Sequence, residues 1–157
     1  MVQVREARTG GMISSARKLI EEYSASLGID LSFENFEQEI AEFPAHYTRP
    51  EGRVLVAVER GEAVGVVCLR RLSARVCELK RMYVKPKFRG RGIGRLLATR
   101  AIREAREIGY ARVRLDTLSK LKEAVSLYGS LGFKEIGPYR VNPNKGVVFL
   151  ELNLGEP

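Results

Sequence analysis

The sequence predicts an α/β (α+β) fold in which helices cover a mixed β-sheet. Segments that alternate apolar and polar residues, as strands do, take turns with segments whose apolar residues recur at helical spacing. Glycine or proline stands at the expected ends of most of these segments. The chain has 157 residues, of which 45% are hydrophobic and 29% charged, enough for a proper core without disulfides or metals. We therefore expect one domain over residues 1–157.

The first half of the chain predicts one strand and two helices. The expected elements are a strand over residues 2–7, a helix over residues 12–27, a second short helix after Ser32, and a loop over residues 46–52. Gly28 is a plausible stop for the first helix, and Pro44 lies just beyond the end of the second.

The second half predicts a hairpin, two longer helices and a closing pair of strands. The expected strands cover residues 53–59, 63–72, 76–84, 111–117, 133–136 and 147–154, and the helices cover residues 92–108 and 121–131. The two-residue turn Arg60-Gly61 joins the first two of these strands as a hairpin. Gly109 and Gly132 end the helices, and residues 142–146 form the last turn.

The net charge of +8 is concentrated in one segment. Residues 80–106 contain ten basic residues and one acid, Glu104, so this segment carries +9 and the rest of the chain about −1. Either a negative partner binds here or the segment is a solvated face. Nucleic acid, an anionic membrane and a phosphorylated small molecule all fit the charge alone.

Other residue types give expectations of absence. Cys68 and Cys77 lie in apolar segments that resemble strands, so we expect both to be buried thiols. The one histidine, His46, and two distant cysteines do not make a typical set of zinc ligands, so we expect no metal. No apolar run approaches the roughly 20 residues that span a bilayer, and the polar N-terminus is not a signal peptide. We expect a cytoplasmic protein that does not bind membranes.

The segment Tyr83-Val-Lys-Pro-Lys-Phe-Arg-Gly-Arg-Gly-Ile-Gly94 predicts a phosphate site. A strand ends, a glycine-rich loop turns, and a helix begins with unpaired N–H groups and partial positive charge. The glycines allow close backbone approach, and Lys85, Lys87, Arg89 and Arg91 add charge. The segment is neither a Walker A loop nor GxGxxG. Taken alone, it could also be a turn among solvated basic residues.

Two motifs together resemble the GNAT family, the GCN5-related N-acetyltransferases. Arg89-Gly-Arg-Gly-Ile-Gly94 matches the pattern of an Arg or Gln followed by spaced glycines that opens a helix. Ala124-Val-Ser-Leu-Tyr-Gly-Ser-Leu-Gly-Phe133 looks like the family's second signature, at the expected distance downstream. The element order over nearly the whole chain agrees. The resemblance implies a mostly antiparallel sheet flanked by helices, the acyl-CoA N-acyltransferase fold.

The resemblance also implies where acetyl-CoA binds. The pyrophosphate would take N–H bonds from the loop formed by Arg89, Gly90, Arg91, Gly92, Ile93 and Gly94. The pantetheine arm would lie along Met82, Tyr83 and Val84, and the next strand, which includes Thr117, would splay away to admit it. Many members have Asn where this chain has Leu121, so that one side-chain contact departs from the family pattern.

Catalytic roles follow from the same resemblance. The family's tyrosine points at the CoA sulfur, which makes Tyr128 the expected acid; a core tyrosine is the alternative. Glu78 is the candidate base, with a water chain or a simple ion pair with Lys80 or Arg81 as alternatives. Strand alternation would put Glu78, Lys80, Met82 and Val84 on one face. The oxyanion donor is expected to be a backbone N–H near Met82 or Tyr83.

The acceptor is expected between the first two helices and the last hairpin. The residues concerned are Glu34, Phe36, His46, Tyr47, Tyr139, Arg140 and Asn142. His46 could be a second base or a plain loop residue, and the aromatic residues could equally belong to the core. The mixed charges here allow an acceptor of either sign or both. Family members are frequently dimers, so a homodimer is possible.

These features predict an N-acetyltransferase that moves the acetyl group of acetyl-CoA to a primary amine of a small molecule or peptide. Direct attack in a ternary complex is the expected mechanism. A non-catalytic acyl-CoA-binding regulator on the same fold is one alternative. A nucleic-acid-binding module is another, but residues 80–106 offer only Tyr83 and Phe88 for stacking bases, so we expect no nucleic acid partner.

Overall fold

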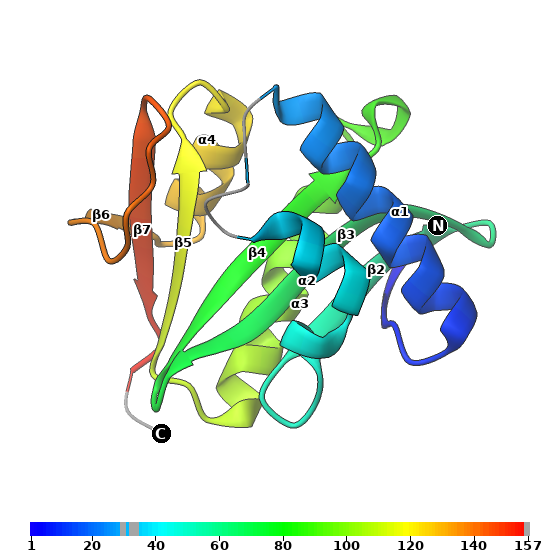
Figure 1. Cartoon of the computed structure of the whole chain (residues 1–157), viewed down its shortest axis with the longest axis horizontal. Helices are drawn as coiled ribbons and strands as arrows, with labels where there is room; N and C mark the ends of the chain where they lie inside the picture. The colour runs from blue at the N-terminus through cyan, green and yellow to red at the C-terminus, as the bar shows by residue number, and fades with distance from the viewer. Residues whose placement is uncertain (29–30, 32–34, 156–157) are drawn as a thin grey trace.

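The computed structural model describes residues 1–28, 31 and 35–155. A seven-stranded sheet with the order β1-β2-β3-β4-β5-β7-β6 forms its centre (Figure 1). The strands are β1 Val2–Glu6, β2 Arg53–Glu59, β3 Glu62–Ser73, β4 Val76–Val84, β5 Arg112–Leu118, β6 Lys134–Ile136 and β7 Val147–Asn153. Every neighbouring pair is antiparallel except β4 and β5, which run parallel. The predicted mixed, mostly antiparallel sheet is confirmed.

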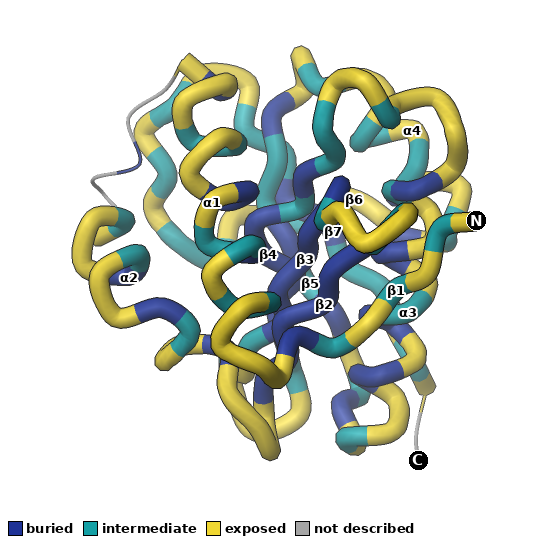
Figure 2. Tube along the Cα trace, turned by 90° about the vertical axis from the view of Figure 1, so that its right-hand side faces the viewer, coloured by how far each residue is buried: buried dark blue, intermediate teal, exposed yellow. Residues whose placement is uncertain are grey.

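Helices cover both faces of the sheet, as Figure 1 shows. On one face lie α1 Gly10–Leu27, α2 Phe36–Glu42 and the 3₁₀ turn η2 Ala45–Tyr47; on the other lie α3 Ile93–Ile108 and α4 Lys122–Ser130. A second 3₁₀ turn, η3 Pro86–Phe88, joins β4 to α3. Each face has its own apolar cluster, and the central strands are the most buried part of the molecule (Figure 2). The expected order of strands and helices is confirmed. Ser32, the expected start of the second helix, lies outside the described residues.

One extra residue in β4 changes which side chains face which layer. Cys68 pairs with Lys80 but Val66 pairs with Tyr83, so β4 has a bulge, and Arg81 there has a φ of 63°. Before the bulge Leu79 belongs to the apolar cluster under α3; after it, Met82 packs against that same cluster. A bulge reverses the alternation of side chains.

The prediction that Glu78, Lys80, Met82 and Val84 share one face is therefore wrong. Met82 and Val84 both pack against the cluster under α3, the face to which the strand turns Leu79 and not Glu78. The alternation rule assumes an uninterrupted strand, and the bulge interrupts this one.

The parallel pair β4 and β5 separates soon after it begins. Only Val76 to Glu78 pair with Arg112 to Arg114, although β4 continues to Val84 and β5 to Leu118. The two strands therefore diverge over their C-terminal halves, as the family resemblance led us to expect.

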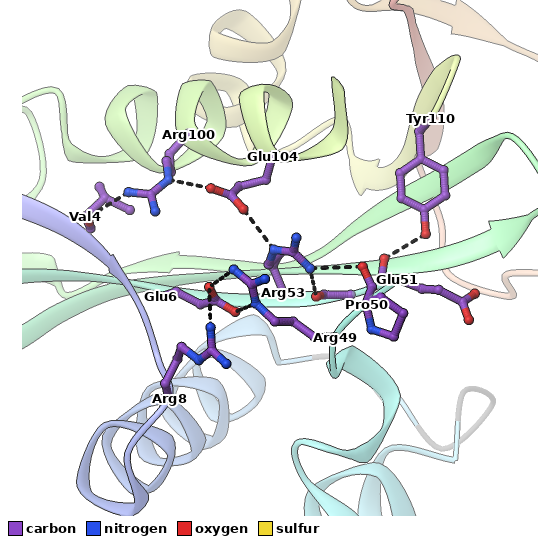
Figure 3. Close-up of polar contacts among 11 residues, drawn as sticks. Val4, Glu6, Arg8, Arg49, Pro50, Glu51, Arg53, Arg100, Glu104 and Tyr110 are labelled. Atoms are coloured by element: carbon purple, nitrogen blue, oxygen red, sulfur yellow. Dashed lines mark hydrogen bonds and ion pairs between the residues drawn. The ribbon is translucent and has the colours of Figure 1, made fainter. Parts of the chain in front are cut away.

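A buried ionic network ties the N-terminal strands to α3 (Figure 3). Arg53 on β2 donates to one oxygen of Glu104 at 2.8 Å, and Arg100 donates to the other at 2.9 Å. Arg100 also donates to the carbonyl of Val4 on β1 at 3.0 Å. Burial by itself would raise the pKa of Glu104, but the hydrogen bonds from Arg100 and Arg53 lower it below 4.5. The carboxylate therefore stays charged and holds three elements together.

Replacing this carboxylate should destabilise the fold in a pH-dependent way. We expect Glu104→Gln to lower the free energy of unfolding by roughly 1–3 kcal/mol at pH 7, because two arginines lose their charged partner. Since the folded pKa is depressed, the difference should be full above pH 4.5 and shrink as pH falls through the folded pKa. Urea unfolding at several pH values measures this. The exposed neighbour Glu107→Gln is the control, and equal stability of both variants would contradict the expectation.

Candidate functional site

A cleft of about 860 Å³ opens where β4 and β5 part. One wall is the end of β4 with the glycine-rich loop, and the opposite wall is the start of α4. The lining residues are Tyr23, Ser26, Leu27, Met82, Tyr83, Val84, Phe88, Arg89, Gly90, Gly92, Ile93, Gly94, Lys120, Leu121, Lys122, Glu123, Ala124 and Leu127. A site of this size suits an extended organic ligand. Eight of the ten residues predicted to contact the cofactor line this cleft; Arg91 and Thr117 do not.

A smaller cavity of about 90 Å³ adjoins the cleft deeper between the strands. Its lining residues are Tyr23, Leu27, Leu31, Leu79, Lys80, Arg81, Met82, Leu115, Asp116, Thr117, Leu118, Leu121, Ala124, Tyr128 and Asn142. Five of these residues, Tyr23, Leu27, Met82, Leu121 and Ala124, also line the large cleft. The two spaces therefore meet beside Met82, and Thr117 and Tyr128 face the inner one.

The glycine-rich loop has the backbone geometry of an anion site. Gly90 and Gly92 have φ values of 78° and 79°, a region that residues with a Cβ rarely adopt. Gly92 precedes the first turn of α3, whose N–H groups have no intrahelical partners. A Cβ on either glycine would meet nothing within 4 Å, so these glycines serve backbone shape rather than tight packing. The loop therefore presents N–H groups to the mouth of the cleft.

The two loop arginines have different surroundings. The Nε of Arg89 donates to the carbonyl of Val84 at 2.9 Å, and its guanidinium lies 5.6 Å from the ring centre of Tyr83. Arg91 instead pairs with Glu59 at 2.6 Å and stacks over Phe88. Arg89 is therefore a wall of the cleft, while the side chain of Arg91 is engaged on β2. A cofactor contact from Arg91 would have to come from its backbone.

Part of the positive charge in residues 80–106 is compensated by ion pairs within the chain. The pairs are Arg81–Glu39, Lys85–Glu62, Arg91–Glu59 and Arg100–Glu104. Charge at the cleft comes also from Lys120 and Lys122 at the start of α4, which the sequence reasoning missed. Their position opposite the loop depends on how α4 packs, so their spacing in the sequence gives no signal.

Tyr128 is buried with 4% of its surface exposed, and it lines the inner cavity. Its ring meets Phe133 edge to face at 5.5 Å between centres. Burial raises its pKa well above the usual value, so the hydroxyl stays protonated at neutral pH. A protonated hydroxyl at this place can donate a proton or a hydrogen bond into the cavity.

Glu78 is fully buried and lines neither space. Arg70 donates to it at 2.9 Å and Tyr139 at 2.6 Å, and Arg140 also contacts it. Burial would raise its pKa, but the charge of Lys80 and the hydrogen bond from Arg140 bring the pKa below 4.5. Glu78 thus fastens the loop before β7 to the sheet. Two of the expected acceptor residues, Tyr139 and Arg140, are held this way.

A second buried carboxylate fastens α2 to the bulge of β4. Arg81 donates to both oxygens of Glu39, at 2.7 and 3.1 Å, and the hydroxyl of Tyr47 donates to the same carboxylate at 2.7 Å. The guanidinium of Arg81 also stacks over Phe36 at 4.9 Å. Tyr47 and Phe36, two of the residues expected near the acceptor, therefore shape the bulge. No sequence pattern signalled the pair between Glu39 and Arg81.

Of the other residues expected near the acceptor, one lines the inner cavity and one does not. His46 lies on the surface beside Glu42, 3.6 Å away, and lines neither space. Asn142 does line the inner cavity. Glu34 lies outside the described residues.

The comparison with family models decides the assignment. Residues 16–133 match the model described as the Acetyltransferase (GNAT) family. The chain belongs to this GNAT family. An N-acetyltransferase of Schizosaccharomyces pombe, itself named as uncharacterised, is 39% identical over 142 residues, which cover 89% of this chain and 87% of that protein. This GNAT protein is therefore an acetyl-CoA-dependent N-acetyltransferase, as its sequence predicted.

Other relatives share smaller regions or only the fold. The N-acetylaspartate synthetase of Danio rerio is 39% identical over 101 residues, which cover 63% of this chain and 36% of that protein. An acetyltransferase from Streptococcus agalactiae has a TM-score of 0.79 at 24% identity, with 98% of each chain covered. A Salmonella typhimurium protein solved with its cofactor acetyl-CoA has a TM-score of 0.70 at 23% identity, covering 99% of this chain and 95% of that one.

The residues of this GNAT protein fit acetyl-CoA. The cleft has a volume of about 860 Å³, its lining includes the glycine-rich loop and three cationic side chains from Arg89, Lys120 and Lys122, and the cavity that adjoins it is lined by Tyr128. Among the described residues there is no group of three or more His, Cys, Asp or Glu that could hold a metal. Nor does any helix in the described ranges have the length and apolar character to cross a bilayer.

The glycine-rich loop can be tested with a matched pair of substitutions. Gly92 and Gly109 both have positive φ, 79° and 112°, and flank the two ends of α3. Alanine at either position should cost roughly 1–2 kcal/mol of stability, since a side chain is strained at positive φ in both places. Only Gly92→Ala should also weaken acetyl-CoA binding, because Gly92 lines the cleft. Titration calorimetry with acetyl-CoA measures this, and equal affinities of the two variants would contradict the assignment.

Proposed function

We propose that this protein transfers the acetyl group of acetyl-CoA to a primary amine by direct attack within one ternary complex. The observation that carries the proposal is the junction of the large cleft with the inner cavity beside Met82, with Tyr128 facing the inner space. A carrier can enter from the cleft while an amine enters from the side of Asn142. Both reactants then meet without a covalent enzyme intermediate.

The chain offers three kinds of contact to acetyl-CoA. The loop from Arg89 to Gly94 provides N–H groups for the pyrophosphate. The edge of β4 after Glu78 makes no ladder with β5, so its peptide groups from Met82 to Val84 can pair with the pantetheine arm. Lys120 and Lys122 add charge on the opposite wall. Thr117 is expected near the thioester, on the strand that diverges from β4.

Acetyl-CoA supplies an activated acyl group, and the protein manages charge and protons. A peptide N–H near Met82 or Tyr83, next to the bulge, is the expected donor to the carbonyl oxygen that gains negative charge. The new C–N bond forms and the C–S bond breaks. An acceptor that arrives as ammonium loses two protons: one reaches the CoA sulfur through the hydroxyl of Tyr128, and the other passes to solvent by way of Glu78 or a water chain.

Glu78 stays a proposed proton acceptor, with a water chain as the alternative. Its contacts with Arg70, Tyr139 and Arg140 favour the charged carboxylate, which is the form that accepts protons. Because Glu78 does not line the inner cavity, a proton would have to reach it through an intervening group.

The acceptor class is open between small molecules and peptides, and the relatives guide the choice of candidates. We propose a panel of simple amines, amino acids and peptides, with aspartate included because N-acetylaspartate synthetases are among the relatives. Thermal unfolding with acetyl-CoA should show a higher melting temperature, since the ligand binds the native state. Amine-dependent thiol release would then establish transfer. A shift without release from any amine would favour the acyl-CoA-binding regulator, and no shift would overturn the cleft assignment.

A cytoplasmic location, a single domain over residues 1–157 and a homodimer remain proposals from the sequence. Size-exclusion chromatography with light scattering tests the last of these.

Removing the hydroxyl of Tyr128 should slow turnover selectively. We expect Tyr128→Phe to lower kcat by roughly a hundredfold, a typical loss for a general acid. Acetyl-CoA affinity should change little, because the ring and its contact with Phe133 remain. Tyr110→Phe is the matched control, since Tyr110 is also buried but donates to the carbonyl of Glu51 instead. An unchanged kcat in Tyr128→Phe would end the assignment.

The Glu78→Gln variant distinguishes two roles of Glu78, proton acceptor and structural partner of Tyr139 and Arg140. If Glu78 accepts the proton, the acidic limb of the kcat profile reports its lowered pKa, below 4.5, and should shift in the variant. The profile, extended below pH 4.5 as far as the protein stays folded, measures this. A superimposable profile would rule out the single-base role and leave Glu78 the task of holding Tyr139 and Arg140.

A further inference from the structure

Asp116 is a carboxylate at the inner cavity that the reaction described so far does not use. It lies on β5 two residues beyond Arg114, the last residue of β5 that pairs with β4. It lines the inner cavity together with Met82 and Tyr128, the residues at which the two substrates are proposed to meet. Its position is therefore on the acceptor side of the expected reaction centre.

Asp116 is oriented by a fixed amide. The Nδ2 of Asn142 donates to one oxygen of Asp116 at 3.1 Å. The Oδ1 of Asn142 is occupied in turn, because it accepts from the backbone N–H of Asn144 at 3.1 Å and from its side chain at 2.9 Å. The amide of Asn142 can therefore turn only its NH₂ group toward Asp116. One hydrogen bond from a neutral amide orients the carboxylate, and the charge of Arg140 acts on it without a direct ion pair.

The carboxylates on neighbouring elements, which do not line the cavity, differ from Asp116 in one respect. Glu39 is paired with Arg81, Glu78 with Arg70 and Arg140, and Glu151 with Arg114. Within the described ranges, Asp116 makes no direct ion pair: it accepts a hydrogen bond from Asn142, and the nearby positive charge of Arg140 is already paired with Glu78. A direct cationic partner for this carboxylate is one that a ligand can supply.

We propose that Asp116, oriented by Asn142, binds the ammonium group of the acceptor. The proposal rests on the transfer function proposed above and adds the form in which the acceptor enters, a protonated primary amine. Alkylamines are mostly protonated near neutral pH. A charge-assisted hydrogen bond to Asp116 would hold the nitrogen in the cavity that Tyr128 faces. The ammonium then loses its first proton to solvent at this position and attacks as the free amine.

The test compares Asp116→Asn with a matched control. Asn keeps the size and shape of the Asp116 side chain but replaces one oxygen with an NH₂ group and removes the charge, so the Michaelis constant for the amine should rise roughly tenfold or more. The affinity for acetyl-CoA should change less than about twofold, because Asp116 does not line the large cleft. Glu151→Gln is the control: it removes a carboxylate from the neighbouring strand, which lines neither space, and should leave the amine constant within about twofold.

A second variant tests whether Asn142 acts on the amine only by orienting Asp116. Asn142→Ala removes the orienting amide and should raise the same constant by a smaller factor. The double variant should be no worse than Asp116→Asn alone, because Asn142 would act only through Asp116. Amine kinetics of Asp116→Asn within twofold of the wild type would overturn this proposal and leave the transferase proposal intact.

Failure of the transferase proposal is distinguishable. If acetyl-CoA binds but no amine of the panel is acetylated, calorimetric titration of L-aspartate and L-alaninamide into the protein–CoA complex decides the matter. Binding of either amine that is lost in Asp116→Asn supports the ammonium site. No binding of either amine to the wild type overturns it.

Discussion

The site depends on the parting of β4 from β5. After Glu78 the two parallel strands no longer pair; the inner cavity lies between them, and the large cleft adjoins it at the end of β4. The extra residue at Arg81 makes this possible, since a bulge bends the strand that carries it. The positive φ of Arg81 is a backbone conformation that residues other than glycine adopt rarely, because it raises the conformational energy. The two hydrogen bonds from Arg81 to the carboxylate of Glu39 stabilise this conformation.

The buried carboxylates hold distant segments in place around this opening. Glu39 fixes α2 to the bulge, Glu78 fixes the loop before β7, and Glu104 fixes β1 and β2 to α3. Each burial is costly, because a charge leaves water, and each pair recovers most of that cost. Net stability is therefore a poor reason for such pairs. Their value here is geometric: each one places an element that borders the site or supports the sheet beneath it.

Local sequence was enough to predict much of this molecule. The Arg60-Gly61 turn has two successive positive φ values, as its two-residue hairpin requires, and the glycine-rich loop lies between a strand and a helix as expected. The contacts that the sequence could not reveal join residues far apart in the chain. Glu39 meets Arg81 across 42 positions, and Asn142 meets Asp116 across 26. Alternation failed at Arg81 for the same reason, since a bulge is fixed by tertiary packing rather than by local propensity.

The proportions of the two spaces bear on how such an enzyme works. The cleft is far larger than the cavity, about 860 against 90 Å³, so most contact area is available to the part of acetyl-CoA that does not react. Binding energy from a remote, unreactive part can orient the reacting group without stabilising the ground state at the reaction centre. The inner cavity then needs few residues, each with one task. A buried, protonated tyrosine such as Tyr128 and an oriented carboxylate such as Asp116 suit that division, because one can give a proton and the other can attract a cation.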